Sequence, residues 1–357
     1  MEDILFIQEY YYYLIAFICL LIVICFTSYL SRYKLWSKTI NVLVVVFSFF
    51  TAYYIGSRPV YIGVDTGRYE QTFLLYKNTG SFFIRKDLFF DFLNYSFSRL
   101  FDFQSFLFLC AFIYVFGVLY GLKKIFKVNY YLPFLVFLIS PYFINNGINV
   151  MRSGIATSIF IAGIGMFYSK AKPWKWISLL AISVLFHFSL FVPLMFFAIT
   201  RYFNRTIIIF LVWLFSILLS VLNINIIASL ITSFEFIAAR GGAYVDTSEE
   251  QNSWVNFFIF GFFPVAFGVY NTLVLKYKDS FYKWILNAYM LAHIPYIILI
   301  SSQYASRLGF LAEFMMPIIL MYPLLINPVI KIKYYRLKLS ILIFCVFMVK
   351  AYKILIV

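Results

Sequence analysis

Apolar runs of about 20 residues, the length that a helix needs to cross a lipid bilayer, recur along almost the whole sequence. Hydrophobic residues make up 64% of the chain and charged residues 12%. Soluble domains carry roughly 45–50% apolar and about 25% charged residues, so a soluble enzyme, a disordered chain and a DNA-binding domain are excluded. We predict an all-α polytopic integral membrane protein with about 12 transmembrane helices, within a range of roughly 10–13. The predicted spans are 11–31, 39–57, 103–122, 129–147, 149–168, 176–199, 206–222, 224–239, 254–275, 284–300, 307–326 and 339–356.

Lysines give the chain an orientation across the membrane. Fourteen of the 18 lysines fall in alternate loops, and basic residues collect in the cytoplasmic loops of membrane proteins. We therefore place these loops in the cytoplasm and the N-terminus outside. Residues 1–357 are predicted to form a single transmembrane domain, with 58–102 as the largest outer loop and 240–253 as a second outer loop.

Two apolar stretches contain polar residues or a proline that bear on how they lie in the membrane. The aromatic stretch from Leu88 to Phe101 is amphipathic and is interrupted by polar residues, which predicts a helix lying on the outer membrane surface. The run 176–199 contains His187 near its middle and Pro193 six residues later. We expect this run to cross the membrane once, and a broken or re-entrant element is the alternative.

Nine of the 11 arginines fall on the side opposite to the lysines, against the trend that orients the chain. Arginine stays protonated and binds phosphate or carboxylate oxygens two at a time. Such a distribution predicts a binding site for an anionic group at the outer face. For any single arginine, the alternative is pairing with an outer acid or a lipid phosphate. The nine are Arg58, Arg68, Arg85, Arg99, Arg152, Arg201, Arg205, Arg240 and Arg307.

Asn145, Asn149 and Arg152 form the first polar constellation. Their spacing of four and three residues predicts one face of a continuous helix. The apolar continuation predicts that this helix enters the membrane with Arg152 near its outer end, where an arginine needs a partner or a wet cavity. We predict that Asn149 and Arg152 bind substrate, and a plain structural anchor is the alternative.

The second constellation lies in the segment RPVYIGVDTGRY, directly after the predicted span 39–57. It supplies Arg58, Arg68 and Tyr69 as candidate substrate-binding residues. Asp65 is a candidate catalytic base, because a carboxylate can accept a proton, orient an arginine or bind sugar hydroxyls. The alternative is that Asp65 caps the helix that holds Tyr69.

Several further polar residues lie inside or beside apolar runs. Neutral His187 can act as a base, and the alternative is a histidine that joins two helices by a hydrogen bond. For His293 we favour that second, structural interpretation. Arg307 begins a span on the outside, and Glu313 lies deeper in the same helix, where a carboxyl group needs a partner, a proton or a polar ligand. Arg240 opens an acidic outer loop that also holds Tyr244. We predict that Arg240, Tyr244, Arg307 and Glu313 are substrate-binding residues.

Motifs of several other enzyme classes are missing from the sequence. It contains no Walker A motif, dinucleotide-binding GxGxxG, HExxH or nucleophile elbow. The first outer loop also lacks the adjacent acidic pair that a metal-dependent lipid-linked glycosyltransferase would offer to its metal. We therefore expect no metal site and no cofactor, with arginines rather than a metal ion at any phosphate leaving group.

Three short motifs together resemble a known family. They are Arg58…Gly63-x-Asp65-x-x-x-Tyr69, Asn149-x-x-Arg152-x-Gly154-Ile155-Ala156, and Phe186-His187-x-Ser189. In order and in predicted sidedness they look like the EpsG-type members of the Wzy-like bacterial polysaccharide (O-antigen) polymerases. Arg240 with Tyr244, and Arg307, also lie where such proteins tend to carry basic residues on the outer face.

The resemblance implies a glycosyltransferase of the bacterial cytoplasmic (inner) membrane with its active site facing outward. Its substrates would be oligosaccharide units carried on undecaprenyl diphosphate, and the growing chain would be transferred to the non-reducing end of the incoming unit. Arg152, Arg240 and Arg307 would hold the diphosphates, Arg58 and Arg68 would bind diphosphate or sugar, and Asp65 or His187 would be the base. The other expected partners are membrane lipid and a chain-length regulator protein, and no nucleic acid is expected.

Two other functional classes share parts of this pattern. Another outer-face transferase, such as an oligosaccharide ligase or an acyltransferase, would have the same basic pocket and a different acceptor. A flippase or transporter of the same lipid-linked oligosaccharide would need charged residues along a cavity open to both sides. The intramembrane charges gather instead towards the predicted outer leaflet, and no two-fold symmetry of hydropathy is evident, which disfavours transport.

Overall fold

The computed structural model describes residues 2–31, 36–85, 87–222, 254, 257–301, 305–329, 331 and 333–356. Within these residues all regular secondary structure is helical, which confirms the predicted all-α class. The chain divides into two compact units. Unit 1 comprises Met1–Phe188 with Ile330–Val357, and unit 2 comprises Ser189–Val329.

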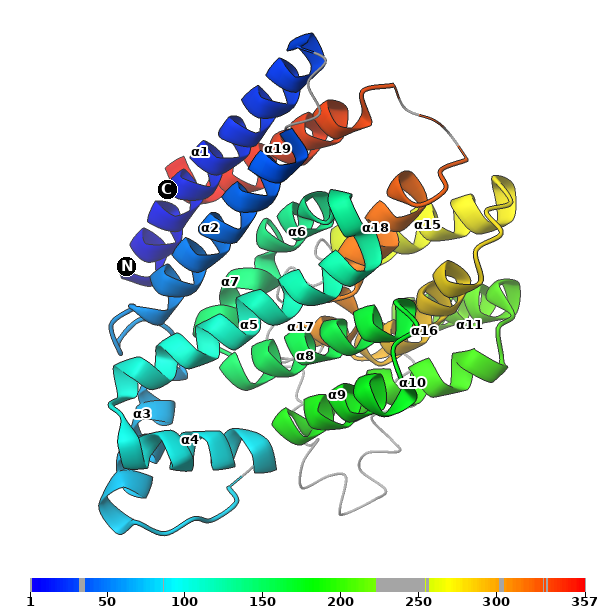
Figure 1. Ribbon diagram of the computed structural model, residues 1–357. Coiled ribbons are helices and arrows are strands. Elements are labelled where there is room, and N and C mark those ends of the chain that lie inside the picture. The colour runs from blue at the N-terminus through cyan, green and yellow to red at the C-terminus, as the bar shows by residue number, and fades with distance from the viewer. Residues whose placement is uncertain are drawn as a thin grey trace. The chain divides into compact units, whose positions relative to one another are not determined.

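Unit 1 is a series of helices that pack side by side. α1 and α2 form a hairpin, and α19 returns from the end of the chain to lie against α1 (Figure 1). α5 packs on both α2 and α8, and α9 packs on α8. The helices of this unit are α1 (Glu2–Ser31), α2 (Trp36–Gly56), α3 (Thr66–Thr79), α4 (Leu88–Leu100), α5 (Phe103–Phe126), the 3-10 helix η1 (Lys127–Asn129), α6 (Tyr131–Leu138), α7 (Pro141–Ile148), α8 (Met151–Tyr168), α9 (Pro173–Phe186) and α19 (Tyr335–Ile356).

Small residues allow the two central helices of unit 1 to approach closely. A Cβ atom placed on Gly121 of α5 would lie 2.4 Å from the carbonyl oxygen of Ile161 on α8, and one placed on Gly165 would lie 2.5 Å from the oxygen of Gly121. Close backbone contact through small residues is a common way for helices to associate in a membrane, where lipid tails are as apolar as leucine. The contact holds α8, and with it Arg152, in a defined place.

Unit 2 is organised around α16, which packs against α10, α11, α17 and α18. The Trp284 indole donates a hydrogen bond to the Phe197 carbonyl of α10 at 2.8 Å, and the Tyr282 hydroxyl donates to the Ile319 carbonyl of α18 at 3.0 Å. The helices are α10 (Phe191–Tyr202), α11 (Thr206–Val221), the π-helices η4 (Phe257–Phe262) and η5 (Tyr270–Val274) with α15 (Phe263–Val269) between them, α16 (Ser280–Ile298), α17 (Ala305–Glu313) and α18 (Met316–Leu325).

Six of the described helical segments are long and apolar enough to cross a membrane, or up to seven if α6 and α7 together make one bent span. The chain is therefore a membrane protein. Each predicted span falls on one helix or on two or three consecutive helices, except 224–239, which lies outside the described residues. The total of about 12 crossings stays a prediction. The six segments are Glu2–Leu30, Lys38–Gly56, Phe103–Asn129, Met151–Tyr168, Phe257–Val274 and Arg307–Leu325.

Two expected continuous helices are interrupted. The run 129–147 becomes α6 and α7, which are bent by 70°, because Pro141 begins a new helix and disfavours helical geometry in the residue before it. The run 176–199 becomes α9 and α10, joined by the 3-10 helix η2 (Phe188–Leu190). Pro193 lies in the first turn of α10, where its missing N–H costs nothing, so the helix breaks upstream at His187.

The segment 58–102 contains two helices of its own, α3 and α4. The amphipathic helix expected from Leu88 to Phe101 is confirmed as α4, whose buried positions include Phe90, Asp91 and Asn94. α3 packs on α4, and α4 in turn contacts α5 and α9. The location of this segment on the outer membrane surface stays a prediction.

Candidate active site

The junction between α7 and α8 receives the segment that follows α2. The carbonyl oxygen of Ile148 accepts hydrogen bonds from the Arg58 guanidinium at 3.3 Å and from the Thr66 hydroxyl at 3.1 Å. Gly63 has a φ of +91°, and a Cβ atom there would lie 2.8 Å from the same oxygen. The two sequence constellations therefore meet at this junction, and the glycine is needed both for its backbone angle and for the space.

Asn149 joins the same two segments through its side chain. Its Oδ1 accepts a hydrogen bond from the Val64 backbone N–H at 2.8 Å, and its Nδ2 donates to the Asn145 side chain at 2.9 Å. The predicted continuous helical face through Asn145, Asn149 and Arg152 is wrong, because α7 ends at Ile148 and Arg152 belongs to the next helix. Asn149 is thus held by the protein itself, and its predicted contact with substrate stays untested.

Arg58 is only 1% exposed. Its Nη1 donates to the Ile55 carbonyl at 2.7 Å, and its Nη2 contacts the Met151 sulfur at 2.9 Å in addition to the Ile148 carbonyl. These partners are neutral, and they connect the end of α2 to the start of α8. The geometry makes Arg58 a tie between these elements, whereas its predicted role as a substrate ligand has no support in the contacts of the described residues.

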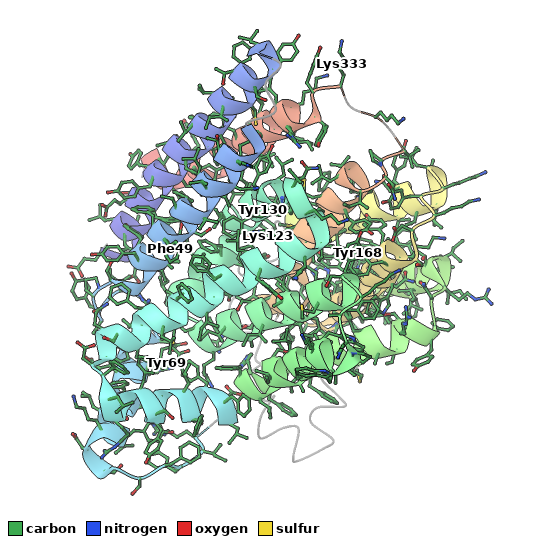
Figure 2. The ribbon with its side chains drawn as sticks, in the orientation of Figure 1. Phe49, Tyr69, Lys123, Tyr130, Tyr168 and Lys333 are labelled. Carbon is green, nitrogen blue, oxygen red and sulfur yellow. The ribbon has the colours of Figure 1, made fainter. Side chains whose placement is uncertain are left out.

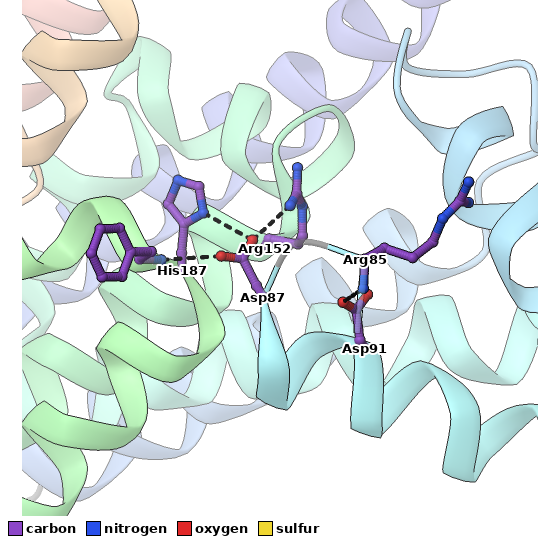
Figure 3. A network of polar contacts seen from close by, with 6 residues as sticks. Arg85, Asp87, Asp91, Arg152 and His187 are labelled. Carbon is purple, nitrogen blue, oxygen red and sulfur yellow. Dashed lines mark hydrogen bonds and ion pairs between the residues drawn. The ribbon is translucent and has the colours of Figure 1, made fainter. Parts of the chain in front are cut away.

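The centre of the site is the Asp87 carboxylate, which is held by groups from two other segments (Figure 3). Asp87, which precedes α4, accepts a hydrogen bond on Oδ2 from Arg152 Nη1 of α8 at 2.6 Å. The same oxygen lies 3.3 Å from Nδ1 of His187 at the end of α9. Oδ1 accepts from the Phe188 backbone N–H at 3.1 Å. An arginine, a histidine and a carboxylate from distant parts of the chain therefore form one polar cluster.

The pKa of Asp87 reflects competition between burial and these donors. The carboxyl is only 6% exposed, and burial raises its pKa. His187 by hydrogen bond and charge, Arg152 by charge and the Phe188 N–H lower it, and together they outweigh burial, so that the pKa lies below its ordinary value. Asp87 is therefore ionised at neutral pH.

Tyr69 joins the cluster from α3. The Arg152 guanidinium lies 6.0 Å from the centre of the Tyr69 ring, within the range of a cation–π contact, and the ring also packs on Phe90. Neither the Arg152 Nε nor the Tyr69 hydroxyl has a hydrogen-bond partner of ordinary geometry among the described residues, and both atoms are buried. Figure 2 places Tyr69 beside α3 and α4, away from Lys123 and Tyr130 near the far end of α5.

The loop before Asp87 is folded back so that the carboxylate reaches α8. The Arg85 backbone N–H donates to the buried Asp91 carboxylate at 2.8 Å (Figure 3). The Arg85 side chain donates to Thr72 at 2.9 Å. The Tyr76 hydroxyl donates to the Phe83 carbonyl at 2.7 Å. These bonds tie the loop to α3 and α4 and leave Asp87 at its end, facing Arg152.

Asp65 and Arg68 form an ion pair with each other at 3.2 Å. The Arg68 side chain is 79% exposed, so the pair contributes little to stability. Asp65 occupies the N-cap position of α3, but its side chain makes no capping hydrogen bond. The capping interpretation is therefore wrong for its side chain, and the predictions of Asp65 as base and Arg68 as ligand remain untested.

Two of the predicted residues lie in unit 2. Glu313 is buried and lies 3.2 Å from Nε2 of the equally buried His293, which joins α17 to α16. The lack of Cβ at Gly261 makes room for this imidazole, since a Cβ there would lie 2.1 Å from its Cε1. Glu313 thus has the partner that an intramembrane carboxyl requires. Arg307 is exposed on α17, and its predicted contact with substrate is untested.

Arg240 and Tyr244 lie outside the described residues, as does the whole second outer loop 240–253. Their roles stay predictions. Among the described residues, no three histidine, cysteine, aspartate or glutamate side chains gather closely enough to hold a metal ion.

Asp87 is the member of the cluster that the sequence did not single out. It is 65 residues from Arg152 and 100 residues from His187, so no local spacing connects them. The one available signal was its position as the acid directly before the amphipathic stretch that became α4. That position is also typical of an ordinary N-cap, which conceals its role.

One comparison with known proteins gives a match. The model of the EpsG family matches residues 41–357, which include all residues of the polar cluster. No curated protein and no solved structure matches this chain. Membership of this family indicates a polysaccharide polymerase-like function.

Proposed function

The chain belongs to the EpsG family, and from this premise we propose that it is a polysaccharide polymerase of the bacterial cytoplasmic membrane. It joins oligosaccharide units carried on undecaprenyl diphosphate, at the outer face, by metal-free glycosyl transfer. The observation that carries the proposal is the cluster in which Asp87 lies between Arg152 and His187. It offers a fixed cation for a leaving diphosphate beside an imidazole that can accept a proton.

The distribution of charge along the helices of unit 1 supports the outer location. Arg152 lies in the first turn of α8 and His187 follows the end of α9, whereas Lys170 and Lys172 lie in the turn between the opposite ends of these helices. Arg58 likewise follows the end of α2, which carries Lys38 in its first turn. Because lysines favour the cytoplasmic side, the end of unit 1 that bears the cluster faces outward.

The cluster suits both halves of a glycosyl transfer. As the bond between the sugar and the diphosphate breaks, negative charge develops on the phosphate oxygens, and a fixed guanidinium in a site of low dielectric stabilises it. Arg152 is suited to this task because Asp87 engages only Nη1, which leaves the second terminal nitrogen, Nη2, for a phosphate oxygen. His187 accepts the proton of the acceptor hydroxyl.

The energy for the reaction is already present in the glycosyl diphosphate, so no nucleotide sugar is consumed. The growing chain leaves its lipid diphosphate and is transferred to the non-reducing end of the incoming lipid-linked unit. Arginines take the place of a metal ion at the leaving group, in keeping with the absence of an adjacent acidic pair in the segment 58–102.

The test uses the purified full-length protein and one defined undecaprenyl-diphosphate oligosaccharide, in detergent with EDTA and without nucleotide sugar. We expect a ladder of products that differ by one repeat unit, and a ladder that forms about 10²–10³-fold more slowly with Arg152→Lys. A product of a single transfer to a different acceptor would support a ligase instead. Movement of the substrate across a vesicle membrane without a new glycosidic bond would support a flippase.

A further inference from the structure

The His187 imidazole has two nitrogens, and its use as a base depends on which of them carries the proton. Nδ1 lies 3.3 Å from Asp87 Oδ2. Nε2 has no hydrogen-bond partner within the part of the chain that the structure describes, and the His187 side chain is 22% exposed. One nitrogen therefore faces a carboxylate and the other remains available to a ligand.

An ionised carboxylate can only accept hydrogen bonds. Asp87 is ionised in this cluster, since Arg152 donates to Oδ2 and the Phe188 N–H donates to Oδ1. The contact with His187 is consequently a hydrogen bond only when Nδ1 carries the proton. In the neutral ring, Nε2 then holds the lone pair that can accept a proton.

We infer that Asp87 is a positioning residue that holds His187 as the Nδ1–H tautomer and so makes Nε2 the proton acceptor of the transfer reaction. This inference rests on the proposed function, in which His187 is the base. Asp87 also orients the ring, because its other oxygen fixes the backbone N–H of Phe188, the residue next to the histidine.

The step balances as follows. The acceptor hydroxyl oxygen forms a bond to the anomeric carbon of the growing chain, and its proton passes to Nε2. The bond between that carbon and the diphosphate oxygen breaks, and the diphosphate leaves with the electron pair next to Arg152. His187 becomes an imidazolium whose charge is stabilised by Asp87, and it later releases the proton to water.

Because Arg152 also binds Asp87, the same carboxylate couples the two functional side chains. A shift of Asp87 would move both the base and the cation that holds the leaving group. The break between α9 and α10 has a local consequence as well, because the Phe188 N–H has Asp87 as its acceptor in place of a carbonyl of a continuing helix.

The direct test is the protonation of the His187 ring in the wild-type protein, measured by nitrogen NMR. The chain has only two histidines, so labelling with 15N-histidine gives two sets of imidazole signals. The set that disappears in a His187→Asn variant belongs to His187. At an alkaline pH at which each imidazole carries a single proton, we expect Nδ1 to be the protonated nitrogen of His187. An Nε2–H tautomer in the wild type would overturn the inference.

The second readout is activity in matched variants. Asp87→Asn replaces the carboxylate by an amide of the same size, which can present its own N–H to Nδ1 and favour the wrong tautomer. We expect kcat to fall by about 10²-fold or more with KM little changed. The control is Asp102→Asn, which removes a charge from an N-cap in the same unit whose capping role asparagine also performs.

The outcomes separate this inference from the proposed function. If Asp87→Asn retains the wild-type tautomer, or polymerises as fast as Asp102→Asn, the positioning role is wrong even though the protein is a polymerase. If the wild type shows the Nδ1–H tautomer but forms no ladder from any lipid-linked substrate, the proposed function fails while the assignment of the tautomer to Asp87 stands.

Discussion

Arg152→Lys is the substitution that most sharply separates charge from geometry in the candidate site. The lysine keeps the positive charge, so Asp87 still has a cation close to it and the folded protein is little disturbed. The lysine side chain lacks the planar guanidinium, with which Arg152 can donate to Asp87 at 2.6 Å and to a second group at the same time.

The expected loss follows from which hydrogen bond disappears. A lysine ammonium that binds Asp87 no longer presents a fixed donor to the leaving diphosphate. Removal of one preorganised donor from a developing charge costs about 10²–10³-fold in kcat, or roughly 2.7–4 kcal/mol of transition-state stabilisation. Removing the charge altogether would in addition leave Asp87 without its shortest partner, so a neutral substitution at Arg152 mixes catalysis with stability.

The assay is the initial rate of ladder formation at saturating lipid-linked substrate, with melting temperature as the measure of folding. Arg99→Lys is the matched control, because Arg99 is exposed on α4 and its guanidinium donates only to the Lys77 carbonyl among the contacts described. A rate for Arg152→Lys within threefold of the Arg99→Lys rate, at an unchanged melting temperature, would refute the assignment of Arg152 to the leaving group.

Three other predictions test the cluster, its support and its side of the membrane. The pKa of Asp87 is lowered in the folded protein, so the stabilisation from its contacts is present above the ordinary pKa of 3.8 and is lost as the pH falls through the lower folded-state pKa. The difference in melting temperature between the wild type and Asp87→Asn should therefore persist at pH 5 and vanish only below about pH 4. Gly63→Ala should destabilise the protein by about 1–2 kcal/mol or more in thermal unfolding, because Gly63 has a φ of +91°. Gly67→Ala should be neutral or stabilising, because no atom lies within 4 Å of the added Cβ. Equal losses of stability in the two variants would contradict this. In intact cells, an impermeant thiol reagent that crosses only the outer envelope should label Ser81→Cys but not Ser169→Cys, and the reverse pattern would overturn the orientation.

The helices could be predicted from the sequence because they follow directly from the apolar runs. Their interruptions were only partly predictable. Pro193 indicated a break in the run 176–199, but the break falls at His187, several residues earlier, because a proline is tolerated in the first turn of the helix that follows. Pro141 carried a similar signal that the uninterrupted hydropathy of the run 129–147 concealed.

The candidate site was predicted in part. Arg152 and His187 could be selected because charged and polar groups are costly beside a membrane, and Tyr69 because it lies in the segment RPVYIGVDTGRY. The structure brings these three residues into one cluster around Asp87. Asp87 could not be selected, since its link to the other residues exists only after α4 has packed on α9. Arg58 was selected for its charge, yet its partners are backbone carbonyls and a methionine sulfur, which no pattern of spacing reveals.

The most direct test of the proposed polymerase is the ratio of undecaprenyl diphosphate released to glycosidic bonds formed. Both quantities can be measured in one reaction of the purified protein with a defined lipid-linked oligosaccharide, by mass spectrometry of the lipid and of the ladder. The account predicts one lipid diphosphate released for each repeat unit added, and both products formed about 10²–10³-fold more slowly by Arg152→Lys. Release of the lipid without chain growth, or chain growth that leaves the lipid diphosphate count unchanged, would contradict it.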